Sequence, residues 1–298
     1  MKKTKTIILI TASALVLCAS GYTLSNAIAS YSQAQRNFQV LERHVYRMAR
    51  GFRGQCAYII KDVQKPALAI SFAQHKPFPA ASIIKLPIAA VAFKAIKEKR
   101  ISADQRIVIS DADITGGSGK LKTLETPITL TFQELIGTMI SRSDNTATNK
   151  LINLLGYQYI NKSFRELGLK RTVLRRKMMD FSGRRHGVEN YTTASDICYL
   201  FEKIYADQLI DKASSELLMD FLKDQKVRDR IPKLLPKSVV VAHKTGLERG
   251  VVHDAGIIFS PKGNRLICVL TKKAKNTKNA KRFIARVALL TYTNISQE

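Results

Sequence analysis

Hydrophobic and polar positions follow a helical spacing early in the chain and then a strand-like one. Within residues 31–50, Phe38 and Leu41 fall on one face of a helix. Two short apolar runs follow, 55–63 and 67–72, and the polar stretch between them contains a proline. Runs of this length around a turn predict a β-hairpin.

The middle of the chain, from about residue 82 to residue 225, has the spacing of helices. Thr131 and Glu134 have the separation of a capping box, in which two side chains satisfy free backbone groups at the start of a helix. Gly156 and Gly168 follow helical runs and are expected to end them. The sequence therefore predicts an all-helical region here.

Near the C-terminus the strand-like spacing returns, and a final amphipathic run at 280–293 predicts a closing helix. Three late strands are predicted, at 238–246, 253–260 and 265–271. With the early hairpin they give an α/β fold: a five-stranded antiparallel sheet flanked by N- and C-terminal helices, with an inserted all-helical domain. The expected division assigns 30–81 and 226–298 to the sheet domain and 82–225 to the helical domain.

The first 29 residues have the layout of a secretory signal peptide. Three lysines precede an apolar run from Ile7 to Cys18, and residues 27–29 supply a small-x-small cleavage pattern. The apolar run is short for a membrane span, and an uncleaved anchor is the alternative. We therefore expect an exported protein, in the periplasm, the cell envelope or outside the cell.

The charge of the chain predicts anionic partners. The formal net charge is +26, and removal of residues 1–29, which contain three lysines and no acid, would leave +23. Nucleic acid is not expected, because an exported protein rarely meets it and no zinc-finger or RNA-binding signature is present. Anionic cell-envelope polymers are the expected partners, and a merely solvated basic surface is the alternative. The basic residues cluster at 169–177, 183–186 and 272–282.

Three cysteines follow the predicted signal peptide, Cys56, Cys198 and Cys268. An oxidising compartment permits a disulfide. Cys56 and Cys268 both lie in strand-like runs and could pair. The alternative is that all three are small buried apolar side chains.

Candidate chemistry begins with Ser82 and Lys85, three residues apart in the apolar stretch "FPAASIIKLP". One helical turn separates them, so the amine is expected beside the hydroxyl. A serine hydroxyl becomes nucleophilic when a base takes its proton. Burial and a second cation lower the pKa of a lysine, which lets it act as that base. A capped helix with a lysine reaching solvent is the alternative.

Two further motifs favour the chemical interpretation. Ser143-Asp144-Asn145 lies between two predicted helices, and Lys244-Thr245-Gly246 ends a predicted strand. S-x-x-K, S-D-N and K-T-G in this order form the signature of active-site serine penicillin-recognising enzymes. Over essentially the whole predicted mature chain, the sequence resembles class A β-lactamases, most closely in "GGSGKL" (116–121), "SDNTATNKLINLLG" and "HKTG".

The resemblance implies a β-lactamase/transpeptidase-like fold with the active site between the two domains, and it implies catalytic roles for three residues. Ser82 would be the acylated nucleophile. Lys85 would be its base or part of a proton relay. Ser143 would pass a proton to the leaving nitrogen.

The resemblance also implies a set of substrate-binding residues. Asn145 would hold the lysine amine and the substrate amide, while Lys244 and Thr245 would bind the substrate carboxylate. The backbone N–H of Leu247 would complete an oxyanion hole with that of the nucleophile. Gly246 would let the substrate lie against the strand edge.

The chain departs from the family pattern at two places. Class A β-lactamases deacylate with a loop glutamate that positions a water molecule, and aligning "TVLRR" with the family loop puts Met178 at that place. Asp180, two residues on, is the nearest acid and a possible substitute. His253 stands where family members usually carry an arginine for the substrate carboxylate, a role that a protonated histidine could fill.

The sequence is compatible with three functions. The first is a serine hydrolase that opens β-lactams and deacylates slowly. The second is a penicillin-binding D-Ala-D-Ala carboxypeptidase acting on peptidoglycan. The third is a non-enzymatic protein that binds β-lactams or the cell envelope. All three are expected to be monomeric and to need no metal or other cofactor.

Overall fold

The central sheet has the strand order β2-β1-β9-β8-β7, and every neighbouring pair is antiparallel. The computed structural model describes residues 31–296, so the predicted signal peptide lies outside the described residues. The strands are β1 (Gln55–Asp62), β2 (Ala69–Phe72), β7 (Val241–Glu248), β8 (Val251–Ile258) and β9 (Arg265–Lys272). The predicted five-stranded antiparallel sheet is confirmed.

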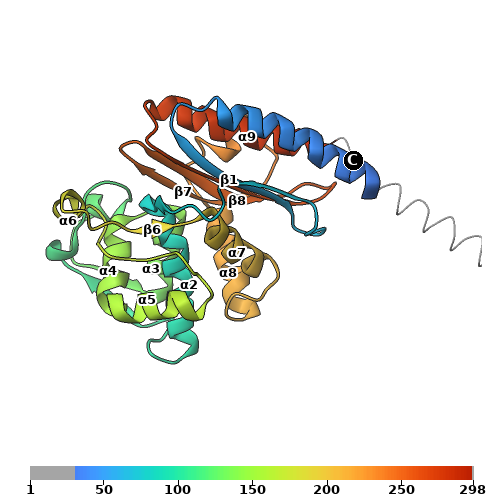
Figure 1. Ribbon diagram of the computed structural model, residues 1–298. Helices are drawn as coiled ribbons and strands as arrows, with labels where there is room; N and C mark the ends of the chain where they lie inside the picture. The colour runs from blue at the N-terminus through green and yellow to red at the C-terminus, as the bar shows by residue number, and fades with distance from the viewer. Residues whose placement is uncertain (1–30, 297–298) are drawn as a thin grey trace, which may run out of the picture.

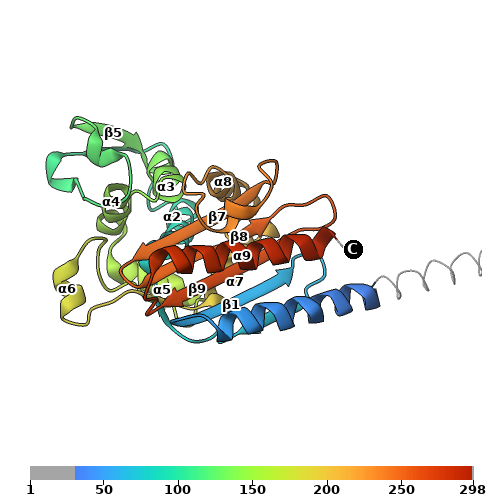
Figure 2. The same cartoon turned by 90° about the horizontal axis from the view of Figure 1, so that it is seen from above.

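Two helices from opposite ends of the chain cover one face of this sheet. The N-terminal helix (residues 31–50) and α9 (Thr277–Ser296) lie side by side there, as Figures 1 and 2 show. Phe38 and Leu41 are buried together with Phe283 and Ile284 in one apolar cluster between the helices and the sheet. The helical spacing of residues 31–50 thus marks the face that packs on the strands.

The remaining α-helices lie on the other face of the sheet and beyond it (Figure 1), whereas the 3₁₀ turn η4 (Ile231–Leu234) packs against α9. Helix α2 (Lys85–Lys97) is at their centre, in contact with α3, α4, α5 and α7, and ten of its thirteen residues are buried. Apolar side chains project from every face of α2, because other elements pack around the whole helix. The other elements are η1 (Ala81–Ile84), η2 (Asp111–Asp113), η3 (Leu121–Thr123), α3 (Phe132–Ser141), α4 (Asn145–Leu155), α5 (Tyr157–Glu166), α6 (Phe181–Arg185), α7 (Ala194–Tyr205), α8 (Lys212–Lys223) and η4 (Ile231–Leu234).

Local signals set several helix ends as expected. Thr131 and Glu134 form the capping box of α3, with both reciprocal hydrogen bonds present. Gly156 follows α4 with a φ of 76°, and Gly168 follows α5 with a φ of 80°. Positive φ values of this kind favour glycine.

The region between the two parts of the sheet is mostly rather than wholly helical. It contains a ladder of β4 (Arg106–Ile109) with β5 (Ile128–Thr131), and β3 (Phe78–Pro79) pairs with β6 (Tyr191–Thr192). These strands have two to four residues each, too short to give a periodic sequence signal. The division into two domains stays a prediction.

Of the two alternatives for the cysteines, the structure has three small buried side chains and no pair between Cys56 and Cys268. Cys56 is buried in the cluster beneath the terminal helices, whereas Cys268 is buried in the cluster on the other face of the sheet. The two side chains therefore project from opposite faces, although their strands are neighbours. Cys198 of α7 is the cysteine beside Cys268, and no disulfide is present among the three. Among residues 31–296, no helix is long and apolar enough to span a membrane.

Candidate active site

The predicted nucleophile and its lysine lie where a short 3₁₀ turn runs into helix α2. Ser82 belongs to η1, and Lys85 is the first residue of α2. Ala81, immediately before the serine, is buried and has a φ of 45°. A left-handed alanine is strained by about 1–2 kcal/mol, and strain of this kind gathers at functional sites.

The amine of Lys85 is fully buried and is held by the Ser-Asp-Asn segment. Its Nζ donates to the backbone oxygen of Ser143 (2.6 Å) and to Oδ1 of Asn145 (2.8 Å). A neutral amine has two N–H groups and one lone pair. The two short bonds use both N–H groups, which leaves the lone pair to accept a proton. These contacts bind the amine to the Ser-Asp-Asn segment rather than to the Ser82 hydroxyl.

The side chain of Ser143 stands between two lysines. Its Oγ accepts a hydrogen bond from Nζ of Lys244 (2.9 Å) and lies 3.4 Å from Nζ of Lys85. Lys244 comes from β7, so the contact joins the sheet to the helical region. The three sequence motifs therefore meet at one point, and Ser143 is placed to pass a proton between the amines.

Both lysines have lowered pKa values. Burial is the largest cause for Lys85, and the neighbouring charge of Lys244 adds to it, so the pKa lies well below its ordinary range. Burial and then the charge of Arg230 lower the pKa of Lys244 to about 7. The site can therefore hold one neutral amine, as a general base requires.

The shape of the Ser-Asp-Asn segment depends on Asp144. Its carboxylate caps α4 by accepting from the N–H of Ala147 (3.0 Å), and its other oxygen accepts from the N–H of Leu121 (2.9 Å). Gly119 passes so close that a Cβ there would lie 2.2 Å from this carboxylate, with φ at 114°. The glycine-rich stretch ahead of the motif is thus needed for a tight wrap around Asp144. Ser143 itself is left-handed, with a φ of 53°.

The strand end of β7 carries the other predicted binding residues. Thr245 is buried, and Leu247 is 45% exposed, on the edge strand of the sheet. A Cβ at Gly246 would lie 3.2 Å from the backbone nitrogen of Ile83 and from the ring of His253. The glycine therefore lets β7 approach the turn that holds the nucleophile. The roles of these residues in binding substrate stay predictions.

The structure contradicts the expected role of His253. The side chain is fully buried in the sheet, its Nε2 lies 2.7 Å from the backbone oxygen of Pro79, and its Nδ1 accepts from the N–H of Thr271. Burial lowers its pKa to about 4. His253 is therefore neutral near pH 7, with both ring nitrogens engaged, and it is not the cation that a substrate carboxylate needs.

Arg230 is a cation of the site that the sequence reasoning missed. It lies just before η4, is 1% exposed, and forms an ion pair with Asp229 (3.0 Å). Its charge lowers the pKa of both Lys244 and His253. Its Nε has no hydrogen-bond partner among residues 31–296, so the guanidinium retains donor capacity.

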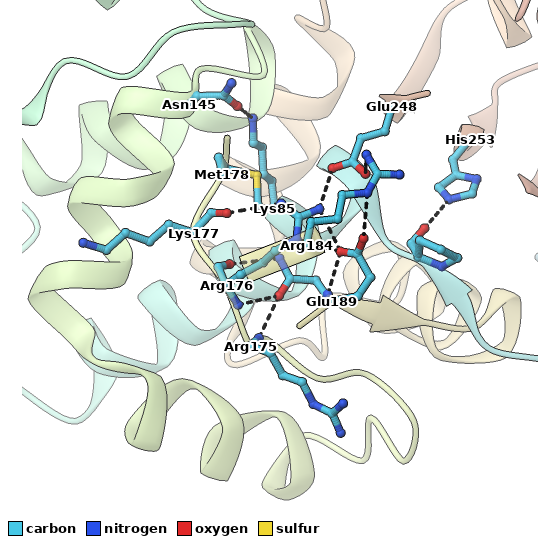
Figure 3. A network of polar contacts seen from close by, with 12 residues as sticks. Lys85, Asn145, Arg175, Arg176, Lys177, Met178, Arg184, Glu189, Glu248 and His253 are labelled. Carbon is cyan, nitrogen blue, oxygen red and sulfur yellow. Dashed lines mark hydrogen bonds and ion pairs between the residues drawn. The ribbon is translucent and has the colours of Figure 1, made fainter. Parts of the chain in front are cut away.

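The loop that follows α5 brings Met178 to the site. The side chain of Asn149 accepts from the N–H of Met178 (2.8 Å) and donates to its carbonyl oxygen (3.2 Å). Asn149 is one helical turn beyond Asn145, the partner of Lys85, so both lie on the same face of α4. Figure 3 shows Met178 on the Lys85 side of the loop, and the side chain is 7% exposed.

The two acidic residues of this loop are engaged elsewhere. Asp180 caps the short helix α6 by accepting from the N–H of Gly183 (2.8 Å), so this candidate substitute for the glutamate has a local structural role. Glu189 is buried and accepts from Nε of Arg176 (2.9 Å). Neither carboxylate contacts Ser82 or Lys85 among the described contacts.

An ionic cluster ties the same loop to the end of β7 (Figure 3). Nη2 of Arg176 lies 2.8 Å from both Glu189 and Glu248, and Arg184 pairs with the same two carboxylates at 3.4 and 3.2 Å. Two positive and two negative charges balance, which suits burial. Glu248 directly follows Leu247, so the cluster fixes the loop relative to the predicted oxyanion hole.

The site holds no candidate metal centre. Across residues 31–296, no group of three or more histidine, cysteine, aspartate or glutamate side chains is placed to bind an ion.

Comparison with known proteins gives one family for the chain. The family model described as "Beta-lactamase enzyme family" matches residues 40–295. β-Lactamase VEB-1 of Pseudomonas aeruginosa is 26% identical over 281 residues, which cover 88% of this chain and 92% of that protein. The extended-spectrum β-lactamase PER-1 of the same organism is 24% identical over 72% of this chain and 74% of its own length.

Solved structures give the same result. A β-lactamase from Sphaerobacter thermophilus has a TM-score of 0.78 and 27% identity, covering 85% of this chain and 97% of that one. A leucine-to-glutamate mutant of PBP-A, solved as an acyl-enzyme complex with penicillin G, has a TM-score of 0.79 and 27% identity, covering 87% and 97%.

Proposed function

We propose that this chain, which belongs to the β-lactamase enzyme family as a class A member, is a serine hydrolase that is acylated by β-lactams at Ser82 and releases the acyl group slowly. The observation that carries the proposal is the buried triad of Lys85, Ser143 and Lys244, in which one hydroxyl links two amines of lowered pKa. The expected export, predicted from residues 1–29, is part of the proposal.

Acylation begins at the free lone pair of Lys85. The neutral amine takes the proton of the Ser82 hydroxyl, and the oxygen attacks the carbonyl carbon of the β-lactam. The developing oxyanion accepts hydrogen bonds from the backbone N–H groups of Ser82 and Leu247. Donors of this kind stabilise a transition state by roughly 2.7–4 kcal/mol each.

Opening of the ring requires a proton on the leaving nitrogen. Ser143 supplies it from its hydroxyl and regains a proton from Lys85 or Lys244, both within 3.4 Å of Oγ. The carboxylate of the substrate would lie near Lys244, Thr245 and Arg230. The cationic form of Lys244 is preferred once this carboxylate binds, because an opposite charge raises the pKa of a lysine.

Deacylation is the step for which the site is poorly equipped. A water molecule must lose a proton as it attacks the ester, and the thioether of Met178 cannot accept one. General-base catalysis typically contributes a factor of about 10²–10⁴. Asn149 holds the loop so that Met178 occupies the place expected for a deacylating base. This placement supports slow release of the acyl group.

The same observation supports a second candidate, a penicillin-binding D-Ala-D-Ala carboxypeptidase. Such an enzyme uses the same acylation machinery on a peptide and is inhibited by β-lactams that leave slowly. The similarity to PBP-A, whose leucine-to-glutamate mutant was solved as an acyl-enzyme complex with penicillin G, is consistent with either candidate.

Two assays test these proposals. A fluorescent penicillin should label the full chain covalently, and Ser82→Ala should abolish the label. Persistent labelling of that variant would show that the nucleophile is elsewhere. Release of D-alanine from a peptide ending in D-Ala-D-Ala, at a rate that exceeds penicillin turnover, would favour the carboxypeptidase.

A further inference from the structure

A cationic pocket lies on the other side of the sheet from the candidate active site. It is an open pocket lined by the end of the N-terminal helix, the turn after it and the beginning of α9, and its volume is about 560 Å³. Figure 2 shows the two helices running side by side, so the end of one meets the start of the other. Ligand pockets in proteins commonly have volumes of about 300–1,000 Å³.

Four cations line this pocket, Arg53, Lys275, Arg282 and Arg286. All four are exposed, and none forms an ion pair with a carboxylate within residues 31–296. Arg282 and Arg286 are four residues apart on α9, a spacing at which like charges destabilise a helix. The two guanidinium groups repel each other weakly, and an anion bound between them would offset this repulsion.

The pocket also offers apolar and amide groups. The rings of Phe52 and Phe283 are stacked with their centroids 4.8 Å apart, and Met48 lines the pocket beside them. Asn276 and Asn279 contribute side-chain amides, which can both donate and accept. Apolar surface, amides and guanidinium groups together match a sugar that carries acidic groups.

We propose that this pocket, lined by Arg53, Lys275, Arg282 and Arg286, binds an anionic glycan whose sugars carry phosphate or carboxylate groups. Guanidinium groups pair with both anions through two parallel hydrogen bonds. The site would hold the protein on a polymer while the candidate active site, on the other face of the sheet, stays open. It also gives a role to Lys275 and Arg282 of the basic cluster at 272–282, which the catalytic site does not use.

The test is a fluorescence-anisotropy titration of the full chain with three labelled oligosaccharides of equal length. One carries phosphate, one is an oligogalacturonate and one is neutral. We expect one or both anionic probes to bind, and the neutral probe to bind far more weakly. The stronger anionic probe identifies the acidic group. Equal binding of all three, or no binding, would overturn the proposal.

Matched variants separate the pocket from the general charge of the protein. Arg282→Gln with Arg286→Gln should weaken binding by about tenfold or more, because two charge-assisted contacts are lost. Lys162→Gln with Lys212→Gln removes the same charge from exposed positions on α5 and α8 and should change affinity less than about twofold.

A third pocket variant, Arg53→Gln, tests whether a loss of binding comes from damage to helix α9. Arg53→Gln changes the turn rather than a helix and should also weaken binding severalfold. Circular dichroism should give the same spectrum for all variants. Equal losses in the pocket and control variants would show that diffuse charge alone attracts the glycan, and the proposal would fail.

Discussion

Met178→Glu should convert a slowly released acyl-enzyme into one that turns over. The side chain is 7% exposed, and its backbone is fixed by two hydrogen bonds to Asn149, so a glutamate of similar length would occupy the same place. Burial raises the pKa of a carboxyl, which suits a base that must take a proton from water near neutral pH. Supplying a general base should accelerate deacylation by about 10²–10⁴-fold.

The assay is the lifetime of the penicillin adduct, followed by intact-protein mass spectrometry after free penicillin is removed. Met178→Gln is the matched control, because its amide has similar size and polarity but is not a base. An unpaired buried polar group costs about 1–3 kcal/mol, and more when it is charged, so thermal denaturation should first show that the variant is folded. Equal adduct lifetimes for the Glu and Gln variants would refute the placement of Met178 next to the ester.

Three further predictions concern the ionic cluster, the two lysines and the buried histidine. In a urea titration, Glu248→Gln should lower the free energy of unfolding by about 1–3 kcal/mol, because it leaves buried charge unbalanced. The control Glu216→Gln removes one partner of an exposed ion pair and should change the free energy of unfolding by less than about 0.5 kcal/mol. The second-order rate constant of acylation, which reports the free enzyme, should rise as Lys85 loses its proton and fall above about pH 7 as Lys244 loses its own. A profile of this rate constant without a falling limb near pH 7 would contradict the assigned roles. His253 has a folded-state pKa of about 4, below its ordinary 6.5, so the unfolded chain binds this proton first and stability is lost as pH falls from about 6.5 to 4. Compared with the wild type, His253→Gln should lose less stability over that range, and an identical loss in urea unfolding would mean that the histidine is not neutral in the sheet.

Much of the fold is encoded in local sequence signals. The capping box at Thr131, the glycines after α4 and α5, and the alternating runs of the strands depend on neighbouring residues, so the sequence is sufficient to predict them. The order of S-x-x-K, S-D-N and K-T-G likewise predicted residues that the structure brings together, since Ser143 contacts both Lys85 and Lys244.

Other features depend on contacts between distant segments. The environment of His253 is set by Pro79 and Thr271, and the cation near Lys244 is Arg230, which no motif marks. A position in an alignment gives the identity of a residue but not its hydrogen-bond partners or the charge around it.

Backbone geometry and side-chain direction were also beyond the sequence. The left-handed conformations of Ala81 and Ser143 arise where the chain is held by its surroundings rather than by residue preference. Cys56 and Cys268 lie in neighbouring strands, but the alternation of side chains along a strand puts them on opposite faces.

The central claim is that Ser82 is acylated and that the protein lacks an effective base for deacylation. The most direct measurement is intact-protein mass spectrometry of the full chain mixed with benzylpenicillin and followed from seconds to hours. The account predicts a rapid mass increase equal to one penicillin molecule, absent in Ser82→Ala, that persists for hours. An adduct that clears within seconds while hydrolysed penicillin accumulates would contradict it, because another group would then be activating water in place of Met178.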